Sequence, residues 1–329
     1  MQCVQVEKKH PGGVGCQNMT DRPTVAEFCC GAGGMAAGFS QHFEIVQAVD
    51  IKSEVMSTYG ANHPETQTHR QDIRTLTGCH GDFDGITGVI GGPPCQGSSI
   101  INTRRQKEMI GAVTLDMEPI PEDPRNAIMG EFMRLVSEIR PGFFVMENVP
   151  GVPAERKAAV ISAGKKAGYT VTSSYLNAAE YGAAQTRKRW IVIGLLGDRP
   201  GWIAPTRRSP TTVRQAFTGI EKNWGIMNSA PETLDTLTRA TDEWSAMSGK
   251  FRNMIRLSWD RPAPAVVNLK KVYMVHPDEC RNISLAEAAA LQGFPARYIW
   301  KGNQSQIAQM IANAMPAQLA EAIAGSVIA

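Results

Sequence analysis

Short apolar runs alternate with helical stretches along the first part of this 329-residue chain. The runs occupy residues 25–29, 45–49, 86–90, 143–146 and 190–195. Helical stretches such as 128–139 and 154–167 lie between them. Continuous apolar runs of this length are typical of strands buried on both faces, and the helices between them indicate crossover connections. The pattern therefore predicts an α/β fold with a parallel sheet and helices on both faces.

The alternation stops near residue 197, and residues 201–260 show no clear period. We expect a small irregular domain there. Regular structure returns towards the C-terminus, where Ser284 and Glu287 have the spacing of a capping box that begins a helix. Leu319, Ile323 and Val327 recur every four residues, which indicates one apolar face on a last helix.

The bulk composition excludes several classes of protein. Hydrophobic residues make up 43% of the chain, and no apolar run approaches the ~18 residues of a membrane span. Residues 1–23 lack an apolar signal core, so we interpret them as a tail. The seven cysteines are odd in number and dispersed, without a C-x-x-C pair. We therefore expect a reducing, cytoplasmic location and no zinc site.

The net charge of +3 does not by itself predict a nucleic-acid partner, but its distribution is suggestive. Between residues 187 and 214 the chain has one acid, Asp198, and a set of cations: Arg187, Lys188, Arg189, Arg199, Arg207, Arg208 and Arg214. Such a run forms either a solvated surface or a stripe that faces phosphates. The sequence leaves both interpretations open.

A glycine-rich turn follows the first apolar run. Gly31, Gly33 and Gly34 would let a nucleotide-like ligand approach the backbone closely. Asp50 ends the second run about twenty residues later, where it can accept hydrogen bonds from a ribose. The turn departs from G-x-G-x-x-G, which disfavours a dinucleotide, but the pattern alone would suit NAD, FAD or an adenosyl compound.

Cys95 follows a stiff turn at the end of another apolar run. Gly91 and Gly92 permit close approach to the backbone, and Pro93 and Pro94 fix φ just before the cysteine. Ligands of open α/β sheets bind at the carboxyl ends of the strands, so the turn could present the thiol to a ligand. The turn alone does not distinguish this from a buried structural cysteine.

Two further segments carry charged groups beside apolar strands. Glu147 ends the run 143–146; shielded from water, its carboxyl would keep a proton near neutrality and act as an acid. A glutamate that simply leaves a strand for solvent is the alternative. Arg187 and Arg189 alternate along an extended segment, which puts both on one side, where they can bind a phosphate or a base carbonyl.

Taken in this order, the motifs strongly resemble those of the DNA (cytosine-5)-methyltransferases. The glycine-rich turn is followed by Pro94-Cys95-Gln96, by Glu147-Asn148-Val149, by Gln185-x-Arg187-x-Arg189 and by a terminal Asn313-Ala314-Met315-Pro316. The order is the unpermuted one, and the resemblance covers residues 24–197 and 259–329. It implies a Rossmann-like methyltransferase sheet and an enzyme that methylates cytosine in duplex DNA with S-adenosylmethionine.

The resemblance assigns Cys95, Glu147, Arg187 and Arg189 to catalysis. Cytosine C5 is too weak a nucleophile to accept a methyl group unaided, and addition of the Cys95 thiolate to C6 makes C5 nucleophilic. Glu147 would contact N3 and the exocyclic amine, and the two arginines would hold O2 and the neighbouring backbone. Because a stacked base cannot be reached, base flipping is implied.

The resemblance also assigns the methyl-donor site. In the family pattern the adenosyl group lies against the glycine turn, Asp50 takes the ribose, Ile51 lies on the adenine, and Asp72-Ile73 reads the adenine edge. The expected cofactor residues are Cys29, Ala32, Gly33, Gly34, Asp50, Ile51, Asp72, Ile73, Pro94 and Asn313.

The same pattern divides the chain into a tail (1–23), a catalytic domain (24–216), a small target-recognition region (217–255) and a return to the catalytic domain (256–329). So small a recognition region predicts a target of about two to four base pairs. The candidate DNA contacts are Arg104, Arg105, Arg239, Lys250 and Arg252. We expect a monomer that is cytoplasmic and nucleoid-associated in a prokaryotic or viral setting, with a cognate restriction endonuclease as a further partner.

Four positions depart from the family pattern. Cys29 replaces an aromatic residue, Ser98 a phenylalanine, Ala290 an arginine and Ala312 a glycine. These departures affect expected cofactor affinity and loop packing more than the type of reaction.

Three alternative functions fit these motifs less well. A tRNA cytosine methyltransferase uses the same motifs, but its Cys-Phe-Thr signature is absent here. A non-catalytic DNA-binding relative would not need Cys95, Glu147, Arg187 and Arg189 together. A nicotinamide oxidoreductase would leave the cysteine and arginine motifs unexplained.

Overall fold

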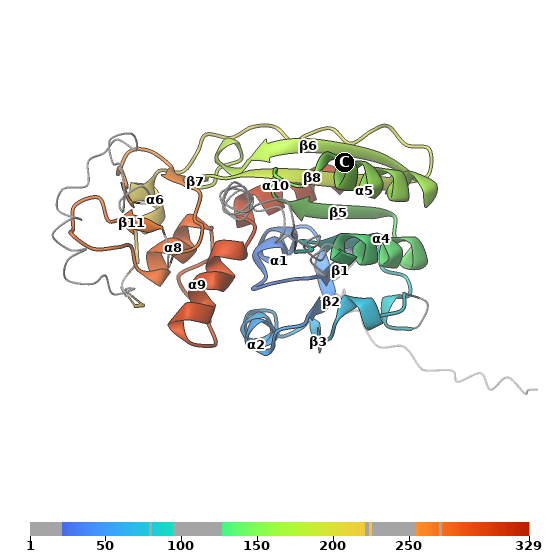
Figure 1. Ribbon diagram of the computed structural model, residues 1–329, viewed down its shortest axis with the longest axis horizontal. Coiled ribbons are helices and arrows are strands. Elements are labelled where there is room, and N and C mark those ends of the chain that lie inside the picture. The colour runs from blue at the N-terminus through green and yellow to red at the C-terminus, as the bar shows by residue number, and fades with distance from the viewer. Residues whose placement is uncertain are drawn as a thin grey trace, which may run out of the picture.

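The computed structural model describes residues 22–78, 81–94, 127–220, 224–225, 254–269 and 272–328. Within them, one seven-stranded sheet has the order β3-β2-β1-β4-β5-β8-β6 (Figure 1). Its strands are β1 (Thr24–Phe28), β2 (Glu44–Asp50), β3 (Gln67–Arg70), β4 (Gly88–Gly91), β5 (Phe143–Asn148), β6 (Tyr169–Asn177) and β8 (Lys188–Leu196). The five predicted apolar runs coincide with β1, β2, β4, β5 and β8.

The sheet is mixed rather than wholly parallel. Strands β3, β2, β1, β4 and β5 are parallel to their neighbours, whereas β8 is antiparallel to both β5 and β6. The prediction of a parallel sheet is therefore wrong for β8. The physical reason is the connection: only residues 178–187 separate β6 from β8, which allows an antiparallel return but not a crossover helix.

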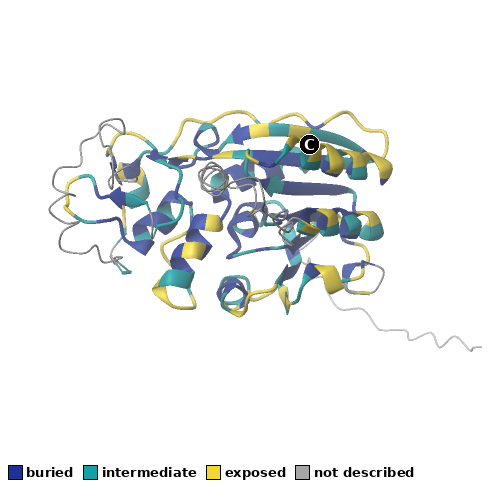
Figure 2. Cartoon of the chain, in the orientation of Figure 1, coloured by how far each residue is buried: buried dark blue, intermediate teal, exposed yellow. Residues whose placement is uncertain are grey.

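Alternate residues of the central strands enter two separate cores. Phe143 and Val145 of β5 belong to one hydrophobic cluster, whereas Phe144 and Met146 belong to the other. Both cores are dark blue in Figure 2. The first core is covered by α1 (Gly34–Phe39), α2 (Ser53–Asn62), α8 (Leu285–Leu291), α9 (Gln304–Asn313) and α10 (Ala317–Ile328), and the second by α4 (Ile128–Ile139) and α5 (Ala154–Lys166). The predicted helical layers on both faces are confirmed.

The last helix closes the fold against the first. The predicted stripe of α10 is buried: Leu319 and Ile323 are fully enclosed, and Val327 packs against the same core. Gly38 of α1 lies directly against the Ala317 carbonyl and the backbone of α10, so a side chain there would have no room. The C-terminal segment therefore belongs physically to the sheet domain.

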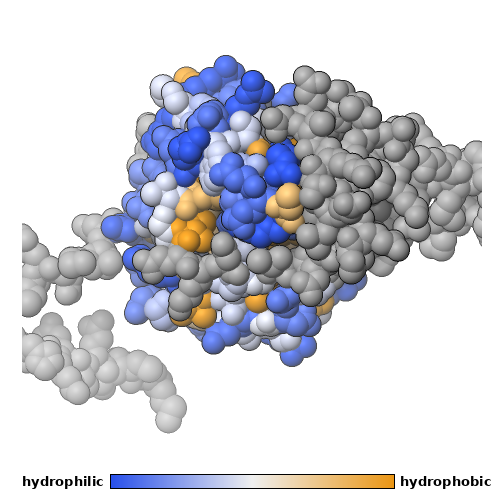
Figure 3. Space-filling model, turned by 90° about the vertical axis from the view of Figure 1, so that its left-hand side faces the viewer, coloured by the Kyte–Doolittle hydropathy of each residue, from blue (hydrophilic) through white to orange (hydrophobic). Residues whose placement is uncertain are grey.

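A smaller lobe lies beyond one end of the sheet (Figure 1, left). It contains α6 (Val213–Phe217) and two short parallel pairs, β7 (Gln185–Thr186) with β10 (Ala263–Pro264) and β9 (Met254–Arg256) with β11 (Tyr273–Val275). The predicted Ser284–Glu287 capping box begins α8. Three short 3₁₀ helices, Ile73–Thr75, Gly81–Phe83 and Ala178–Glu180, complete the described elements. Among the described residues on this face, Figure 3 shows mostly hydrophilic side chains around a few hydrophobic patches.

Candidate active site

A cavity of about 770 Å³ opens at the carboxyl ends of β1, β2, β4 and β5. This is the edge at which open α/β sheets bind ligands, and the volume suits a small molecule. All of the predicted cofactor residues except Gly33 line it: Cys29, Ala32, Gly34, Asp50, Ile51, Asp72, Ile73, Pro94 and Asn313. Glu147 lines the same cavity.

The glycine turn forms one wall of the cavity because its backbone takes conformations that side chains oppose. Gly31 and Gly33 have φ of 55° and 80°. The N–H of Gly31 donates to Asp50 Oδ2 at 3.1 Å, which ties the turn to the end of β2. A Cβ on Gly33 would lie 2.9 Å from Tyr298 Oη and from His63 Nε2. Gly33 therefore packs against these two side chains and does not line the cavity.

The residues predicted to contact the ribose and the adenine, Asp50 and Ile51, line the cavity next to the glycine turn. Asp50 accepts backbone hydrogen bonds from Gly31 and Lys52, both at 3.1 Å. Burial raises the pKa of Asp50, although these hydrogen bonds oppose the shift. Ile51 is 56% exposed beside it, an unusual exposure for a large apolar side chain. Asp72 caps the following 3₁₀ helix through the N–H of Arg74 at 3.0 Å.

A buried carboxyl that the sequence analysis did not single out, Glu27, also lines the cavity. It is 2% exposed and accepts a 2.9 Å hydrogen bond from Tyr59 Oη. Burial raises its pKa to about 8, against a smaller lowering by that hydrogen bond. The sequence signal that could have identified Glu27 is its position inside the apolar run 25–29, where a charged residue is unexpected. Tyr59 lies 32 residues further along the chain, so its contact with Glu27 could not be predicted.

Glu147 and Arg189 meet across neighbouring strands β5 and β8. Arg189 Nε lies 2.5 Å from Glu147 Oε1, and both side chains are largely buried. Gly92 leaves the space beside this pair open, since a Cβ there would come within 3.2 Å of Glu147 Oε2. The alternative interpretation, in which Glu147 simply leaves the strand for solvent, is therefore not what the structure shows.

The turn that leads to Cys95 is anchored by the residue after Glu147. Asn148 is 4% exposed, and its Nδ2 donates to the Pro93 carbonyl at 3.0 Å. Pro94 lines the cavity. Cys95 itself lies outside the described residues, as do Ser98 and all five candidate DNA contacts: Arg104, Arg105, Arg239, Lys250 and Arg252.

Arg187 has surroundings unlike those of Arg189. The burial pattern alternates along 185–189 as predicted. However, Arg187 is 2% exposed and donates to the carbonyls of Val266 at 2.6 Å and Ala312 at 2.7 Å. Burial and the nearby Arg189 guanidinium hold the pKa of Arg187 well below its usual value. In this arrangement its two terminal NH groups donate to backbone carbonyls rather than to a base.

Three of the cations in the predicted basic stripe are paired with acids. Arg207 lies 3.1 Å from Glu180, Arg208 3.2 Å from Glu321, and Arg214 3.1 Å from Asp260. All three arginines are more than half exposed, so these pairs contribute little to stability. For these positions the structure favours the solvated-surface interpretation.

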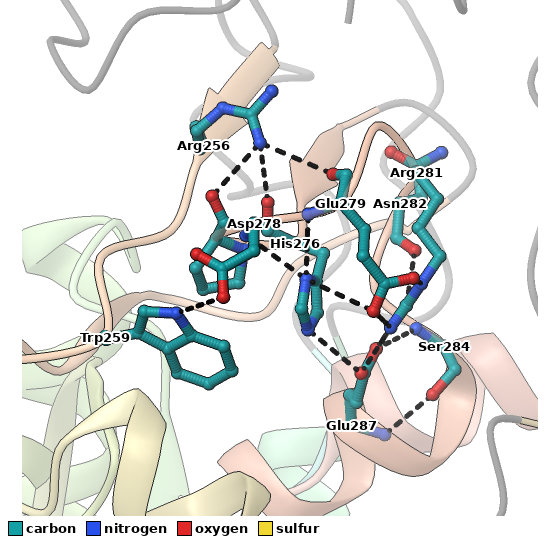
Figure 4. Close-up of polar contacts among 10 residues, drawn as sticks. Arg256, Trp259, His276, Asp278, Glu279, Arg281, Asn282, Ser284 and Glu287 are labelled. Atoms are coloured by element: carbon teal, nitrogen blue, oxygen red, sulfur yellow. Dashed lines mark hydrogen bonds and ion pairs between the residues drawn. The ribbon is translucent and has the colours of Figure 1, made fainter. Parts of the chain in front are cut away.

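A second charged cluster stabilises the small lobe (Figure 4). Arg281 forms a two-pronged contact with Glu287, with N–O distances of 2.8 and 2.9 Å. Glu279 also pairs with Arg281, and Trp259 Nε1 donates to Asp278 at 2.9 Å. These groups order the loop before α8 and do not line the cavity.

The fold and the cavity define a class. The sheet, with a glycine turn after β1, an acid at the end of β2 and a ligand-sized cavity at the strand ends, has the architecture of α/β folds that bind a small ligand at this edge. Within the described residues, no helix is long and apolar enough to cross a membrane.

Comparisons with known proteins identify the family. The model of the C-5 cytosine-specific DNA methylase family matches residues 24–216 and 209–329, and the chain belongs to this family. Type II methyltransferase M1.HphI of Haemophilus parahaemolyticus is 31% identical over 335 residues, covering 93% of this chain and 86% of that protein. Type II methyltransferase M.DdeI of Desulfomicrobium norvegicum is 27% identical over 379 residues, covering 91% and 87%.

A solved structure agrees at the level of the fold. S. pombe Dnmt2 methyltransferase superposes with a TM-score of 0.66 at 18% identity, covering 94% of this chain and 99% of that one. The family match confirms the predicted fold class and the predicted enzyme, a DNA (cytosine-5-)-methyltransferase. The family match contradicts the alternative of a nicotinamide oxidoreductase. It gives the alternative of a tRNA cytosine methyltransferase no better support. The roles of individual residues stay predictions.

Proposed function

We propose that this enzyme transfers the methyl group of S-adenosylmethionine to C5 of a flipped-out cytosine in duplex DNA, with Cys95 as the nucleophile. The observation that carries the proposal is the shared cavity: Glu147 and the predicted donor residues line one space at the strand ends. Pro94, the residue before Cys95, lines it too. A cofactor group and a reacting base would therefore meet there.

The cavity fits S-adenosylmethionine by size and by chemistry. Asp50 offers carboxylate oxygens that would accept hydrogen bonds from a ribose, the exposed face of Ile51 suits an adenine ring, and Gly31 and Gly34 leave the backbone accessible. Buried Glu27 supplies a carboxyl group in a cavity that would take a cationic molecule. When bound, S-adenosylmethionine supplies an electrophilic methyl group on a sulfonium.

The chain's own groups would activate the base. The Cys95 thiolate would add to C6, so that C5 becomes nucleophilic and takes the methyl group from the sulfonium, which leaves S-adenosylhomocysteine as the product. Glu147 holds a proton or hydrogen bond at N3, and Arg189, already beside Glu147, reaches O2. Removal of the C5 proton and departure of the Cys95 sulfur restore the aromatic ring. Arg187 is better placed as a positioning residue than as a base contact.

The remaining expectations concern partners. Base flipping costs a few kcal/mol, which contacts from the recognition region would offset. That region, 217–255, is small, and we propose a short target sequence of about two to four base pairs. Relatives named as Type II methyltransferases support a role in restriction–modification, with a monomeric enzyme and a cognate endonuclease acting on the same site.

Trapping on a fluorinated substrate tests the proposal. Duplex DNA with 5-fluorocytosine blocks loss of the C5 substituent, so the wild-type enzyme with S-adenosylmethionine should form a stable covalent adduct. Cys95→Ser should form none. Absence of the wild-type adduct at every cytosine context would contradict the proposal, and methyl transfer to tRNA in preference to DNA would favour the tRNA alternative.

A further inference from the structure

A buried polar network links the strand segment of Arg189 to the end of helix α9, where Asn313 lies. Its members are Gln185, Arg187 and Gln292, which are 0%, 2% and 0% exposed. They come from two regions of the chain about a hundred residues apart. Polar groups at this depth are costly unless each has a partner, so their contacts fix the relative position of the segments they join.

The two glutamines join three backbone segments. Gln185 Nε2 donates to the Leu291 carbonyl at 2.7 Å and to Gln292 Oε1 at 3.0 Å, and its Oε1 accepts from the N–H of Val266 at 2.9 Å. Gln292 Nε2 donates in turn to the Ile311 carbonyl at 2.6 Å. The end of α8 is thereby tied to β7 on one side and to α9 on the other.

Arg187 adds a parallel connection. Its two terminal nitrogens donate to the Val266 and Ala312 carbonyls. The network therefore holds the carbonyls of both residues that precede Asn313. Two residues beyond Arg187, Arg189 pairs with Glu147 on the base side of the cavity.

The turn after Asn313 packs directly on the glycine turn. A Cβ on Gly34 would lie 2.5 Å from the Met315 carbonyl oxygen and 3.0 Å from the Ala314 side chain. Asn313, Ala314 and Met315 all line the cavity. A shift at the end of α9 would therefore change the width of the donor site.

We propose that Gln292, together with Gln185 and Arg187, is a positioning group that holds Asn313 and its turn against the glycine turn and so sets the affinity for the methyl donor. The identity of that ligand rests on the function proposed above. The network also fixes the position of Asn313 relative to the Glu147–Arg189 pair. Arg187, which holds the Ala312 carbonyl, and Arg189, which pairs with Glu147, are only two residues apart.

Gln292→Met tests this inference, since it keeps side-chain length but removes both hydrogen bonds of the amide. The dissociation constant and KM for S-adenosylmethionine should rise on the order of tenfold, with KM for DNA little changed. Ser284→Ala is the matched control: it removes the cap at the opposite end of α8, so it should lower the melting temperature without changing donor affinity. Titration calorimetry and thermal unfolding give the two readouts.

A second variant tests the same inference in case Gln292→Met does not fold. Arg187→Lys keeps the charge but offers one ammonium in place of two spread NH groups, and it should weaken donor binding in the same way. Donor affinity unchanged in either folded variant, or weakened equally by Ser284→Ala, would overturn the inference. A wild-type enzyme that binds no S-adenosylmethionine would instead contradict the proposed function itself.

Discussion

The donor cavity and the charged cluster of the small lobe differ in the partners that they give their acidic side chains. In the lobe, Glu287 is neutralised by the two-pronged contact with Arg281. In the cavity, Glu27 meets the neutral hydroxyl of Tyr59, and Asp50 meets backbone N–H groups. The lobe cluster is complete without a ligand, whereas the cavity keeps acidic groups available to one. Glu27 and Asp50 therefore differ from Glu287 in having no protein cation as a direct partner, whereas Glu147, on the base side of the cavity, keeps one in Arg189.

The same substitution in the two regions should break different properties. Glu147→Gln removes the carboxylate beside the reacting base, so methyl transfer should fall by about 10²–10⁴-fold, with donor affinity little changed. Transfer of labelled methyl groups to DNA gives the rate, and calorimetry gives the affinity. Retention of near wild-type activity would show that Glu147 is not the acid of the reaction.

Glu287→Gln should act on stability instead. It removes the two-pronged contact of the half-buried Arg281 and leaves that guanidinium only the exposed Glu279 as a charged partner, and we expect a loss of about 3 kcal/mol in the free energy of unfolding. Urea unfolding measures this loss. The specific activity of the folded fraction should stay close to that of the wild type, and a fall comparable to that of Glu147→Gln would erase the contrast between the two regions.

The contrast extends to pH. Burial raises the pKa of Glu27 to about 8 in the folded state from an ordinary 4.5, so the folded protein holds the proton more tightly than the unfolded chain. This contribution to stability is therefore present at low pH and is lost as the pH rises from about 4.5 to about 8. Glu27→Gln should flatten the decline in urea-unfolding free energy between pH 5.5 and 8.5. An equally steep decline in the variant would contradict the assignment.

Glu287 should show the opposite slope. Burial alone would raise its pKa, but the Arg281 guanidinium and the Ser284 N–H lower it below the ordinary value. Its stabilisation is present above the ordinary pKa of a glutamate and is lost as the pH falls through the lowered value. Relative to wild type, the Glu287→Gln deficit should therefore shrink in acid. A deficit that grows there would reverse the assigned sign.

The smallest effect should come from the exposed cavity wall. Ile51 is more than half exposed, so Ile51→Ser should change the free energy of unfolding by no more than about 0.5 kcal/mol. Lost contact with the adenine ring should raise KM for S-adenosylmethionine several-fold. A stability loss without a change in KM would assign Ile51 to packing.

Sequence patterns predicted the parts of the molecule that depend on local chemistry. The continuous apolar runs identified the interior strands, the Ser284–Glu287 spacing identified the start of α8, and the glycine turn with Asp50 identified the cavity. Edge strands β3 and β6 were missed, since β3 is wholly polar and mostly exposed, and β6 mixes polar with apolar side chains. Their sequences therefore lack a continuous apolar run.

Long-range partners were beyond the reach of local patterns. Arg187 and Arg189 look alike in the sequence, and only the folded chain shows that Val266 and Ala312 occupy one while Glu147 pairs with the other. The same holds for Gln292, whose partners come from β7 and α9. No spacing rule connects these positions. The proposed division between a base-contacting and a positioning arginine rests on this difference.

Bisulfite sequencing of DNA from cells that express the chain tests the central claim most directly, with Cys95→Ser as control. We predict protection of cytosines within one short sequence of about two to four base pairs, and none in the control. Absence of protected cytosines in cells with folded wild-type protein, or equal protection with Cys95→Ser, would contradict the assignment of this cavity to cytosine methylation.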